Sequence, residues 1–208
     1  MTQKEDKNDN KESIKIITLG NSDVGKSNYI LRFTEDVFRQ NYLLTTGMDF
    51  RTKEVTMKPD NKKYNVILYD TAGQERFKSI SLSIIKKVDG VLLLYDITNK
   101  VSFESIQNWM NNIYSIKSED FPVVLLGNKC DLESERKVSK KDGEELAAKY
   151  GIEFFETSNK DGINIKEACS KLIEEIIIHK KNKKDNNNIK IKNKNNQNQD
   201  NGKCACKK

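Results

Sequence analysis

A glycine-rich octapeptide near the N-terminus has the residue types and spacing that bind phosphate. It matches the pattern GxxxxGK(S/T), and its residues are Gly20, Asn21, Ser22, Asp23, Val24, Gly25, Lys26 and Ser27. Glycines let the backbone pass close to an anion, and successive N–H groups at the start of a helix then bind it. In this chemistry Lys26 contacts the terminal phosphates and the Ser27 hydroxyl ligates magnesium, with Asn28 next in the chain. Alone, the pattern indicates only a nucleoside triphosphate site.

A second motif, Asp70-Thr71-Ala72-Gly73-Gln74, has residue types suited to hydrolysis of such a nucleotide. A carboxylate at a strand end, here Asp70, can hold magnesium through water. The N–H of Gly73 can contact the terminal phosphate. Gln74 can orient the attacking water, because phosphoryl transfer depends on positioning and charge stabilisation more than on a strong base.

Two tetrapeptides contain groups that can recognise guanine. They are Asn128-Lys129-Cys130-Asp131 and Thr157-Ser158-Asn159-Lys160. The Asp131 carboxylate can accept hydrogen bonds from guanine N1–H and its 2-amino group, whereas adenine lacks both donors and leaves a buried carboxylate unpaired. Lys129 can lie along the face of the base. Backbone N–H groups of the second tetrapeptide, at Ser158, Asn159 and Lys160, can bind guanine O6.

The elements that position these motifs alternate between strands and helices. Apolar runs predict six strands, at Ile14–Leu19, Met48–Met57, Tyr64–Tyr69, Gly90–Asp96, Pro122–Gly127 and Glu153–Glu156. Helical spacing predicts helices at Val24–Phe33, Val101–Lys117, Ser139–Tyr150 and Ile163–His179. This order predicts an α/β fold of three layers, with a mostly parallel six-stranded sheet, one antiparallel edge strand and about five helices. Trp109 fits the buried stripe of its helix and is expected to pack in the core.

Charge divides the chain into a near-neutral domain and a basic tail. Ten Lys and two Asp between Lys180 and Lys208 give +8, while the whole chain is +6, so residues 1–179 carry −2. We expect residues 1–12 and 180–208 to be disordered and residues 13–179 to form one domain. A single His and scattered Cys exclude a multi-histidine metal site and a zinc site. With no signal peptide or membrane span, the chain is expected to face the cytosol.

The ordered set GNSDVGKS, DTAGQ, NKCD and TSNK resembles the small Ras-like GTPases over about residues 13–178. Within them, DTAGQERF, LYDIT and the terminal Cys204-Ala205-Cys206 resemble the Rab family. The resemblance implies a P-loop GTPase fold and slow hydrolysis of GTP to GDP with Mg²⁺. It also implies a cycle between the two nucleotide states that regulates vesicle trafficking and membrane identity. Thr45 is then the catalytic and magnesium-binding switch residue, Phe38 lies edge-on to guanine and Tyr42 lies over the phosphates.

The same resemblance implies partners and a membrane anchor. Exchange factors, activating proteins and effectors are expected to contact switch regions near residues 42–50 and 71–88, and escort proteins to extract the chain. Cys204 and Cys206 resemble a double geranylgeranylation site, which places the protein on the cytoplasmic face of an intracellular membrane with a cytosolic pool. Lys207 and Lys208 after the last Cys depart from the family pattern.

Other departures predict a divergent member. Asp23 stands where Gly or another small residue is usual. Either its charge weakens nucleotide binding and speeds exchange, or it points to solvent and does little. Asn159 stands where Ala is usual and is expected to matter little, because its backbone N–H does the binding. Phe50, Tyr69 and Ile84 stand at an exposed aromatic triad, so the set of partners is expected to differ.

Three alternatives belong to other functional classes or branches. A metabolic P-loop kinase needs a lid and an acceptor site, and the chain has no Arg-rich insertion for a lid. A nucleic-acid binder would use the Lys-rich tail, but that tail has no aromatic residues for stacking, so no nucleic acid is expected. A Ras-like branch that acts in signalling remains the alternative to vesicle traffic.

Overall fold

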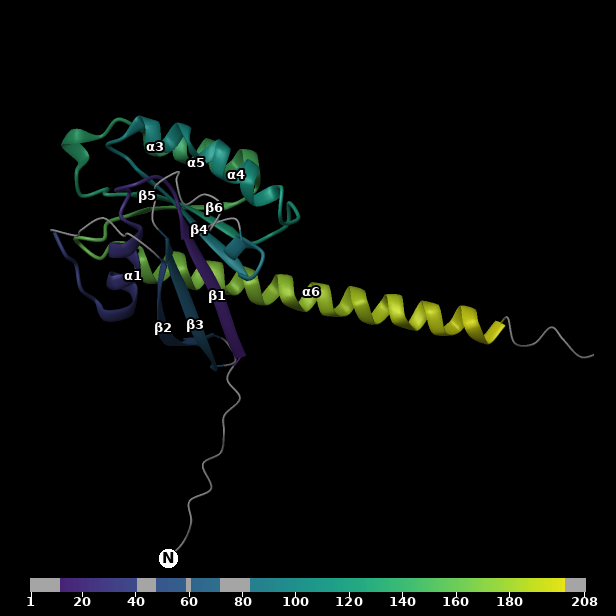
Figure 1. The fold of residues 1–208 in the computed structure, drawn as a ribbon. Helices are drawn as coiled ribbons and strands as arrows, with labels where there is room; N and C mark the ends of the chain where they lie inside the picture. Colours follow the sequence, from purple (N-terminus) through teal and green to yellow (C-terminus); the bar gives the residue numbers. More distant parts are fainter. Residues whose placement is uncertain (1–11, 41–47, 59–60, 72–82, 201–208) are drawn as a thin grey trace, which may run out of the picture.

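The computed structural model describes residues 12–40, 48–58, 61–71 and 83–200 (Figure 1). Its strands are β1 (Glu12–Leu19), β2 (Met48–Met57), β3 (Lys62–Thr71), β4 (Gly90–Asp96), β5 (Val123–Asn128) and β6 (Glu153–Thr157). Its helices are α1 (Lys26–Glu35), α3 (Lys100–Glu104), α4 (Ile106–Tyr114), the short 3-10 helix η2 (Glu133–Glu135), α5 (Lys140–Tyr150) and α6 (Ile165–Asp200). The predicted six strands are therefore confirmed, each within a few residues.

One twisted sheet organises the molecule, in the order β2-β3-β1-β4-β5-β6. β1 pairs in parallel with β3 and β4, and the pairs β4–β5 and β5–β6 are also parallel. The β2–β3 pair is antiparallel, which places one antiparallel strand at the edge as predicted. The carboxyl ends of the five parallel strands consequently lie along one edge of the sheet, where ligands bind in folds of this kind.

Helices cover both faces of the sheet, because side chains along the central strands alternate in direction. On β1, Ile14 and Ile16 pack in one apolar cluster with residues of α1 and α6. Ile17 and Leu19 pack in a second cluster with residues of α4 and α5. In Figure 1, α1 and α6 lie on one side of the sheet and α3, α4 and α5 on the other. This is the predicted three-layer arrangement.

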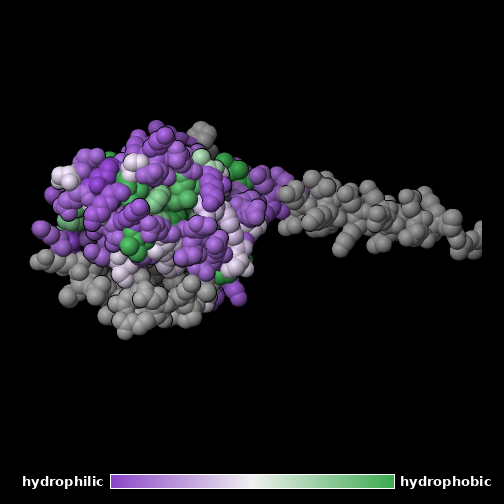
Figure 2. Space-filling model, turned by 90° about the horizontal axis from the view of Figure 1, so that it is seen from above, coloured by the Kyte–Doolittle hydropathy of each residue, from purple (hydrophilic) through white to green (hydrophobic). Residues whose placement is uncertain are grey.

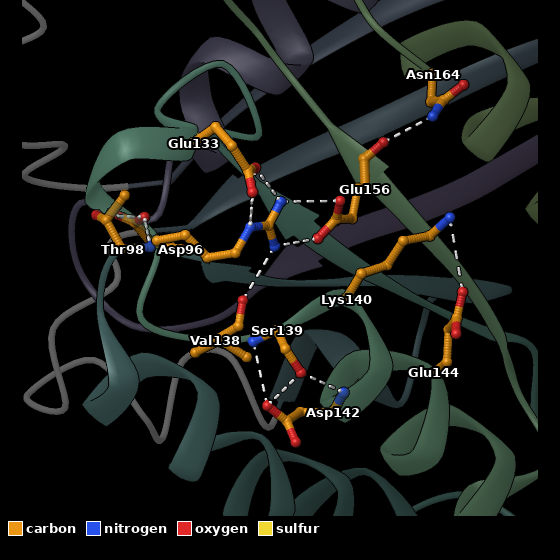
Figure 3. Close-up of polar contacts among 11 residues, drawn as sticks. Asp96, Thr98, Glu133, Val138, Ser139, Lys140, Asp142, Glu144, Glu156 and Asn164 are labelled. Atoms are coloured by element: carbon orange, nitrogen blue, oxygen red, sulfur yellow. Dashed lines mark hydrogen bonds and ion pairs between the residues drawn. The ribbon is translucent and has the colours of Figure 1, made fainter.

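The helix predicted over Val101–Lys117 is two helices that meet at Ser105. The Ser105 hydroxyl donates to the Val101 carbonyl oxygen at 2.8 Å. A serine that bonds back to the preceding turn competes with the helical ladder and often bends a helix. The helix predicted from Ser139 is confirmed with its capping box, in which Ser139 and Asp142 exchange side-chain and backbone hydrogen bonds (Figure 3).

The last helix differs most from expectation, because α6 continues to Asp200 through sequence for which disorder was predicted from Lys180. Its first turns are fixed by Ala168, Leu172 and Ile176, which are fully buried against the sheet. Once such a nucleus exists, each further residue adds one hydrogen bond at little extra cost, so polar residues can prolong the helix. Of the helices described, none is both long enough and apolar enough to cross a membrane.

Candidate functional site

The glycine-rich loop connects the end of β1 to α1, and two of its glycines are required by close packing. Gly20 has a φ of +137°, and a Cβ there would lie 2.2 Å from the Leu94 carbonyl oxygen. Gly25 has a φ of +96°, and a Cβ there would lie 2.4 Å from Asn128 Nδ2. Only glycine fits both demands, so the backbone of this loop lies directly against β4 and the end of β5.

Lys26 is buried at the centre of the loop. Its Nζ donates to the carbonyl oxygens of Gly20 at 3.1 Å and Asn21 at 2.7 Å. Burial lowers the pKa of the Lys26 ammonium to about 8, and the nearby carboxylates of Asp70 and Asp23 oppose that shift. The ammonium is therefore poorly solvated, which favours its transfer to a strong anionic acceptor such as a phosphate oxygen.

The Asn21 side chain ties the phosphate loop to the helical layer. Asn21 Nδ2 donates to Ser105 Oγ at 3.0 Å, and Trp109 Nε1 donates to Asn21 Oδ1 at 3.1 Å. Trp109 also packs against the apolar cluster of α4 and α5, as predicted, but its indole N–H has this additional role. Sequence reasoning missed the link, although a half-buried Trp usually finds a partner for its N–H.

Asp23 lies on the outside of the loop. Its side chain is 93% exposed, and its Oδ2 is 3.8 Å from Lys129 Nζ. Lys129 makes a closer ion pair with Asp96 at the end of β4, at 2.7 Å. Of the two alternatives for Asp23, this geometry favours the one in which the carboxylate points to solvent, where its effect on bound phosphate is largely screened.

The end of β5 meets both the phosphate loop and the end of β6 through Asn128. Asn128 is fully buried; its Nδ2 donates to the Val24 carbonyl oxygen at 2.7 Å, and its Oδ1 accepts from Thr157 Oγ1 at 3.1 Å. Ser158 Oγ donates to one carboxylate oxygen of Asp131 at 2.6 Å. The two predicted guanine tetrapeptides are thus brought together, and Ser158 fixes the orientation of the carboxylate.

Asn159 contradicts the expectation that its side chain matters little. It is 4% exposed, and its Nδ2 donates to the Gly25 carbonyl oxygen at 2.9 Å. Arg32 of α1 donates to the backbone oxygens of both Asn159 and Lys160. The Ser158 N–H donates to the Ile163 carbonyl oxygen. Of the three N–H groups predicted to bind guanine O6, those of Asn159 and Lys160 therefore make no backbone hydrogen bond within the described residues.

The Arg136 guanidinium links the segments that lead into these loops through hydrogen bonds. Arg136 donates to the carboxylates of Glu133 and Glu156 and to the Val138 carbonyl oxygen. Figure 3 labels these three acceptor residues. Its hydrogen bond lowers the pKa of the Glu133 carboxyl. Glu156 directly precedes Thr157, so this network fixes the start of the second guanine tetrapeptide. The sequence motifs did not reveal it.

Residues suited to magnesium lie beside Lys26. Ser27 follows Lys26 in the first turn of α1, and Asp70 is buried near the end of β3, close enough for its charge to act on Lys26. Across the described ranges there is no cluster of three or more His, Cys, Asp or Glu that could hold a metal. A hydroxyl and one carboxylate, completed by phosphate oxygens and water, is the donor set that Mg²⁺ prefers, so these residues fit the ion.

Several predicted site residues lie outside the described ranges: Tyr42, Thr45, Gly73, Gln74, Cys204 and Cys206. Phe38 is half-buried. Asn28 exchanges two hydrogen bonds with the Arg39 backbone, at 3.0 and 3.1 Å, which holds the segment containing Phe38 near α1. The Asn28 side chain is therefore engaged within the protein, and its backbone N–H remains the group that can face a phosphate.

The expected aromatic triad is only partly exposed. Phe50 on β2 is 60% exposed and contacts the half-buried Tyr69 ring, with 6.4 Å between their centroids. Ile84 is 8% exposed and packs in the core with α4 and α5, so the exposed position predicted for it is wrong. Figure 2 shows a face of the molecule whose described residues are largely hydrophilic, with smaller apolar patches.

The fold and the arrangement of the four motifs at one sheet edge define a P-loop GTPase. The Ras family model matches residues 15–178. Ras-related protein Rab-13 of Bos taurus is 46% identical to this chain over 164 residues, 79% of the chain and 80% of that protein. Ras-related protein Rab-8B of Homo sapiens is 43% identical over 173 residues, 83% of the chain and 82% of that protein.

The chain therefore belongs to the Ras family and, within it, to the Rab GTPases. It is a small GTPase that hydrolyses GTP and acts as a Rab-type regulator of vesicle traffic, as the sequence motifs predicted. The resemblance drawn from GNSDVGKS, DTAGQ, NKCD and TSNK is thereby confirmed over nearly the whole domain.

Proposed function

We propose that this Rab-type switch holds Mg²⁺ and GTP at the edge formed by the carboxyl ends of β1, β3, β5 and β6. The observation that supports the site best is the direct contact between its two halves: Asn128, in the guanine tetrapeptide, donates to the Val24 carbonyl oxygen of the phosphate loop at 2.7 Å. A nucleotide that spans base and phosphates requires this closeness.

The proposed roles follow from the chemistry of each group. Lys26 exchanges its carbonyl partners for the β- and γ-phosphates, Ser27 and Thr45 ligate the metal directly, and Asp70 does so through water. The metal, when bound, neutralises charge on the phosphates. Gln74 orients the attacking water, and Gly73 N–H contacts the γ-phosphate. Asp131, held by Ser158, accepts the two guanine donors.

The chain is proposed to act at the cytoplasmic face of an intracellular membrane. Prenyl groups on Cys204 and Cys206 would anchor it, at about 0.8 kcal/mol for each buried CH₂. Lysines of the tail add attraction to anionic lipid. The ten Lys among residues 180–208 support this role, and so does the family to which the chain belongs.

Exchange factors, activating proteins, effectors and escort proteins are the proposed partners. The exposed Phe50 supports an effector surface near residues 42–50, because aromatic residues are enriched in protein–protein interfaces. The second contact region is proposed near residues 71–88.

A nucleotide assay and a localisation assay together test the proposal. The purified chain should bind GDP and GTP with Mg²⁺ but not ATP, and Gln74→Leu should slow GTP hydrolysis at least tenfold without loss of GTP binding. A tagged chain should label an intracellular membrane, and Cys204→Ser/Cys206→Ser should make that signal uniformly cytosolic. Equal binding of ATP and GTP would refute the guanine site, and membrane labelling that survives the double substitution would refute the anchor.

A further inference from the structure

Asn159, in the second guanine tetrapeptide, is buried where this turn meets the phosphate loop. Its Nδ2 donates to the Gly25 carbonyl oxygen at 2.9 Å. Asn128 Nδ2 donates to the Val24 carbonyl oxygen, one residue earlier, at 2.7 Å. A Cβ on Gly25 would lie 2.7 Å from Asn159 Nδ2 and 2.4 Å from Asn128 Nδ2, so the two amides flank the same residue.

Each of these hydrogen bonds fixes a different peptide plane. A trans peptide is planar, with its C=O and N–H pointing in opposite directions. Fixing the Val24 carbonyl therefore directs the Gly25 N–H, and fixing the Gly25 carbonyl directs the Lys26 N–H. Both N–H groups then point away from the asparagines, towards the side on which a phosphate-binding loop presents its donors. Gly25 has a φ of +96°, a region that glycine enters and leaves easily. Its carbonyl oxygen also accepts from the Tyr29 N–H of α1 at 2.9 Å, so the Asn159 amide is a second support for the orientation of this peptide.

The Asn159 side chain also carries a cost for the fold. Its Oδ1 is buried and has no hydrogen-bond partner within the described residues. A buried, unpaired carbonyl oxygen destabilises a protein, and an alanine would not have this group. The benefit of the amide is therefore expected in ligand binding rather than in stability. Arg32, which donates to the Asn159 backbone oxygen at 2.7 Å, holds the residue against α1 from the other side.

We propose that Asn159 is a positioning residue that couples guanine recognition to phosphate binding. When guanine orders the turn at residues 157–160, the Asn159 amide holds the Gly25–Lys26 peptide in the orientation that binds the β-phosphate. This inference rests on the proposed nucleotide site.

The coupling predicts that substitution of Asn159 weakens the binding of nucleotides with a β-phosphate, which contact the phosphate loop, more than that of nucleotides without one. Asn159→Ala loses one hydrogen bond, so GDP should dissociate about 3- to 10-fold faster. GMP, which has no β-phosphate, should lose less than about 2-fold in affinity. Asn159→Asp replaces the donor with an acceptor that faces the Gly25 carbonyl oxygen, so its loss of GDP affinity should exceed that of Asn159→Ala.

The experiment uses the full chain and measures GDP release by displacement of a fluorescent GDP, affinities for GDP and GMP by calorimetry, and thermal stability. Asn108→Ala, at an exposed position of α4, is the matched control and should match the wild type throughout. A thermal midpoint for Asn159→Ala at or above that of the wild type, with a lower ratio of GDP to GMP affinity, supports the proposal. Equal losses for GDP and GMP, or unchanged release, would overturn it. Failure of the wild type to bind GDP would instead refute the nucleotide site itself.

Discussion

Replacing Arg136 with alanine should be among the most destabilising single changes at the rear of the site. The guanidinium makes hydrogen bonds of 2.5 and 3.1 Å to Glu156, of 2.9 and 2.7 Å to Glu133, and of 3.0 Å to the Val138 carbonyl oxygen. The Glu156 side chain is 15% exposed, whereas that of Glu133 is 70% exposed. The two pairs are therefore not equivalent.

The expected magnitude follows from that difference. Loss of the partner of a buried carboxylate costs about 3–5 kcal/mol, whereas an exposed pair contributes about 0–1 kcal/mol. Because Glu156 retains some contact with water, Arg136→Ala should lower the free energy of unfolding by about 2–4 kcal/mol. Glu156→Gln in that background removes the unpaired charge and should restore at least about 1 kcal/mol.

Urea unfolding of the wild type, the two single variants and the double variant measures this coupling as a double-mutant cycle. Arg136→Lys is the control that keeps the positive charge but lacks the planar set of N–H donors, and its loss of unfolding free energy should be intermediate. A loss below about 0.5 kcal/mol for Arg136→Ala, or additive effects of the two substitutions, would show that the network does not brace the loop.

Three further predictions concern Glu175, Trp109 and Tyr29. Burial raises the pKa of Glu175 to about 7 from 4.5, so the folded state binds the proton more tightly and stability is lost as the pH rises from 4.5 through 7. Glu175→Gln should then exceed the wild type in stability by about 1–2 kcal/mol at pH 8, after allowance for partial solvation, and match it near pH 4; a gain independent of pH in thermal melts would contradict this. Trp109 is the single Trp, so its fluorescence emission should change when a chelator removes Mg²⁺ and GDP is released. Asn21→Ala breaks the 3.1 Å hydrogen bond to Trp109 and should abolish most of that change; an unaltered response would refute the link. Tyr29→Phe removes the 2.9 Å bond to the buried Ile165 carbonyl oxygen and should cost about 1–3 kcal/mol by urea unfolding, and a neutral effect would argue against burial of that group.

The sequence was most informative where a local pattern fixes both an element and a group. The motifs themselves locate Gly20, Gly25 and Asn128, although the contacts that fix these residues are with distant segments, and the strands that precede the motifs are continuous apolar runs. The capping box at Ser139 is equally local, because all its atoms lie within four residues. These features could be placed without knowledge of the rest of the chain.

Contacts between distant segments could not be predicted in this way. Asn159 was expected to act through its backbone, because nothing in TSNK shows that its amide lies 2.9 Å from the Gly25 carbonyl oxygen, 134 positions away. The same holds for Trp109 and Asn21, which are 88 positions apart. The break at Ser105 and the continuation of α6 depend on a balance of small terms, helical propagation against side-chain competition, which composition alone does not resolve.

The continuation of α6 sets a length as well as a shape. The 21 residues from Lys180 to Asp200 rise about 30 Å at 1.5 Å per residue. In Figure 1 this part of the helix extends beyond the sheet and its helical layers. A flexible coil of that length would allow any distance between the domain and the membrane surface up to its full extension. A helix instead holds the two apart by a distance comparable to the diameter of a small domain. With the anchor proposed at Cys204 and Cys206, only partners whose binding surface lies at that distance from the membrane would contact the switch regions. The length of the helix would therefore help to select those partners.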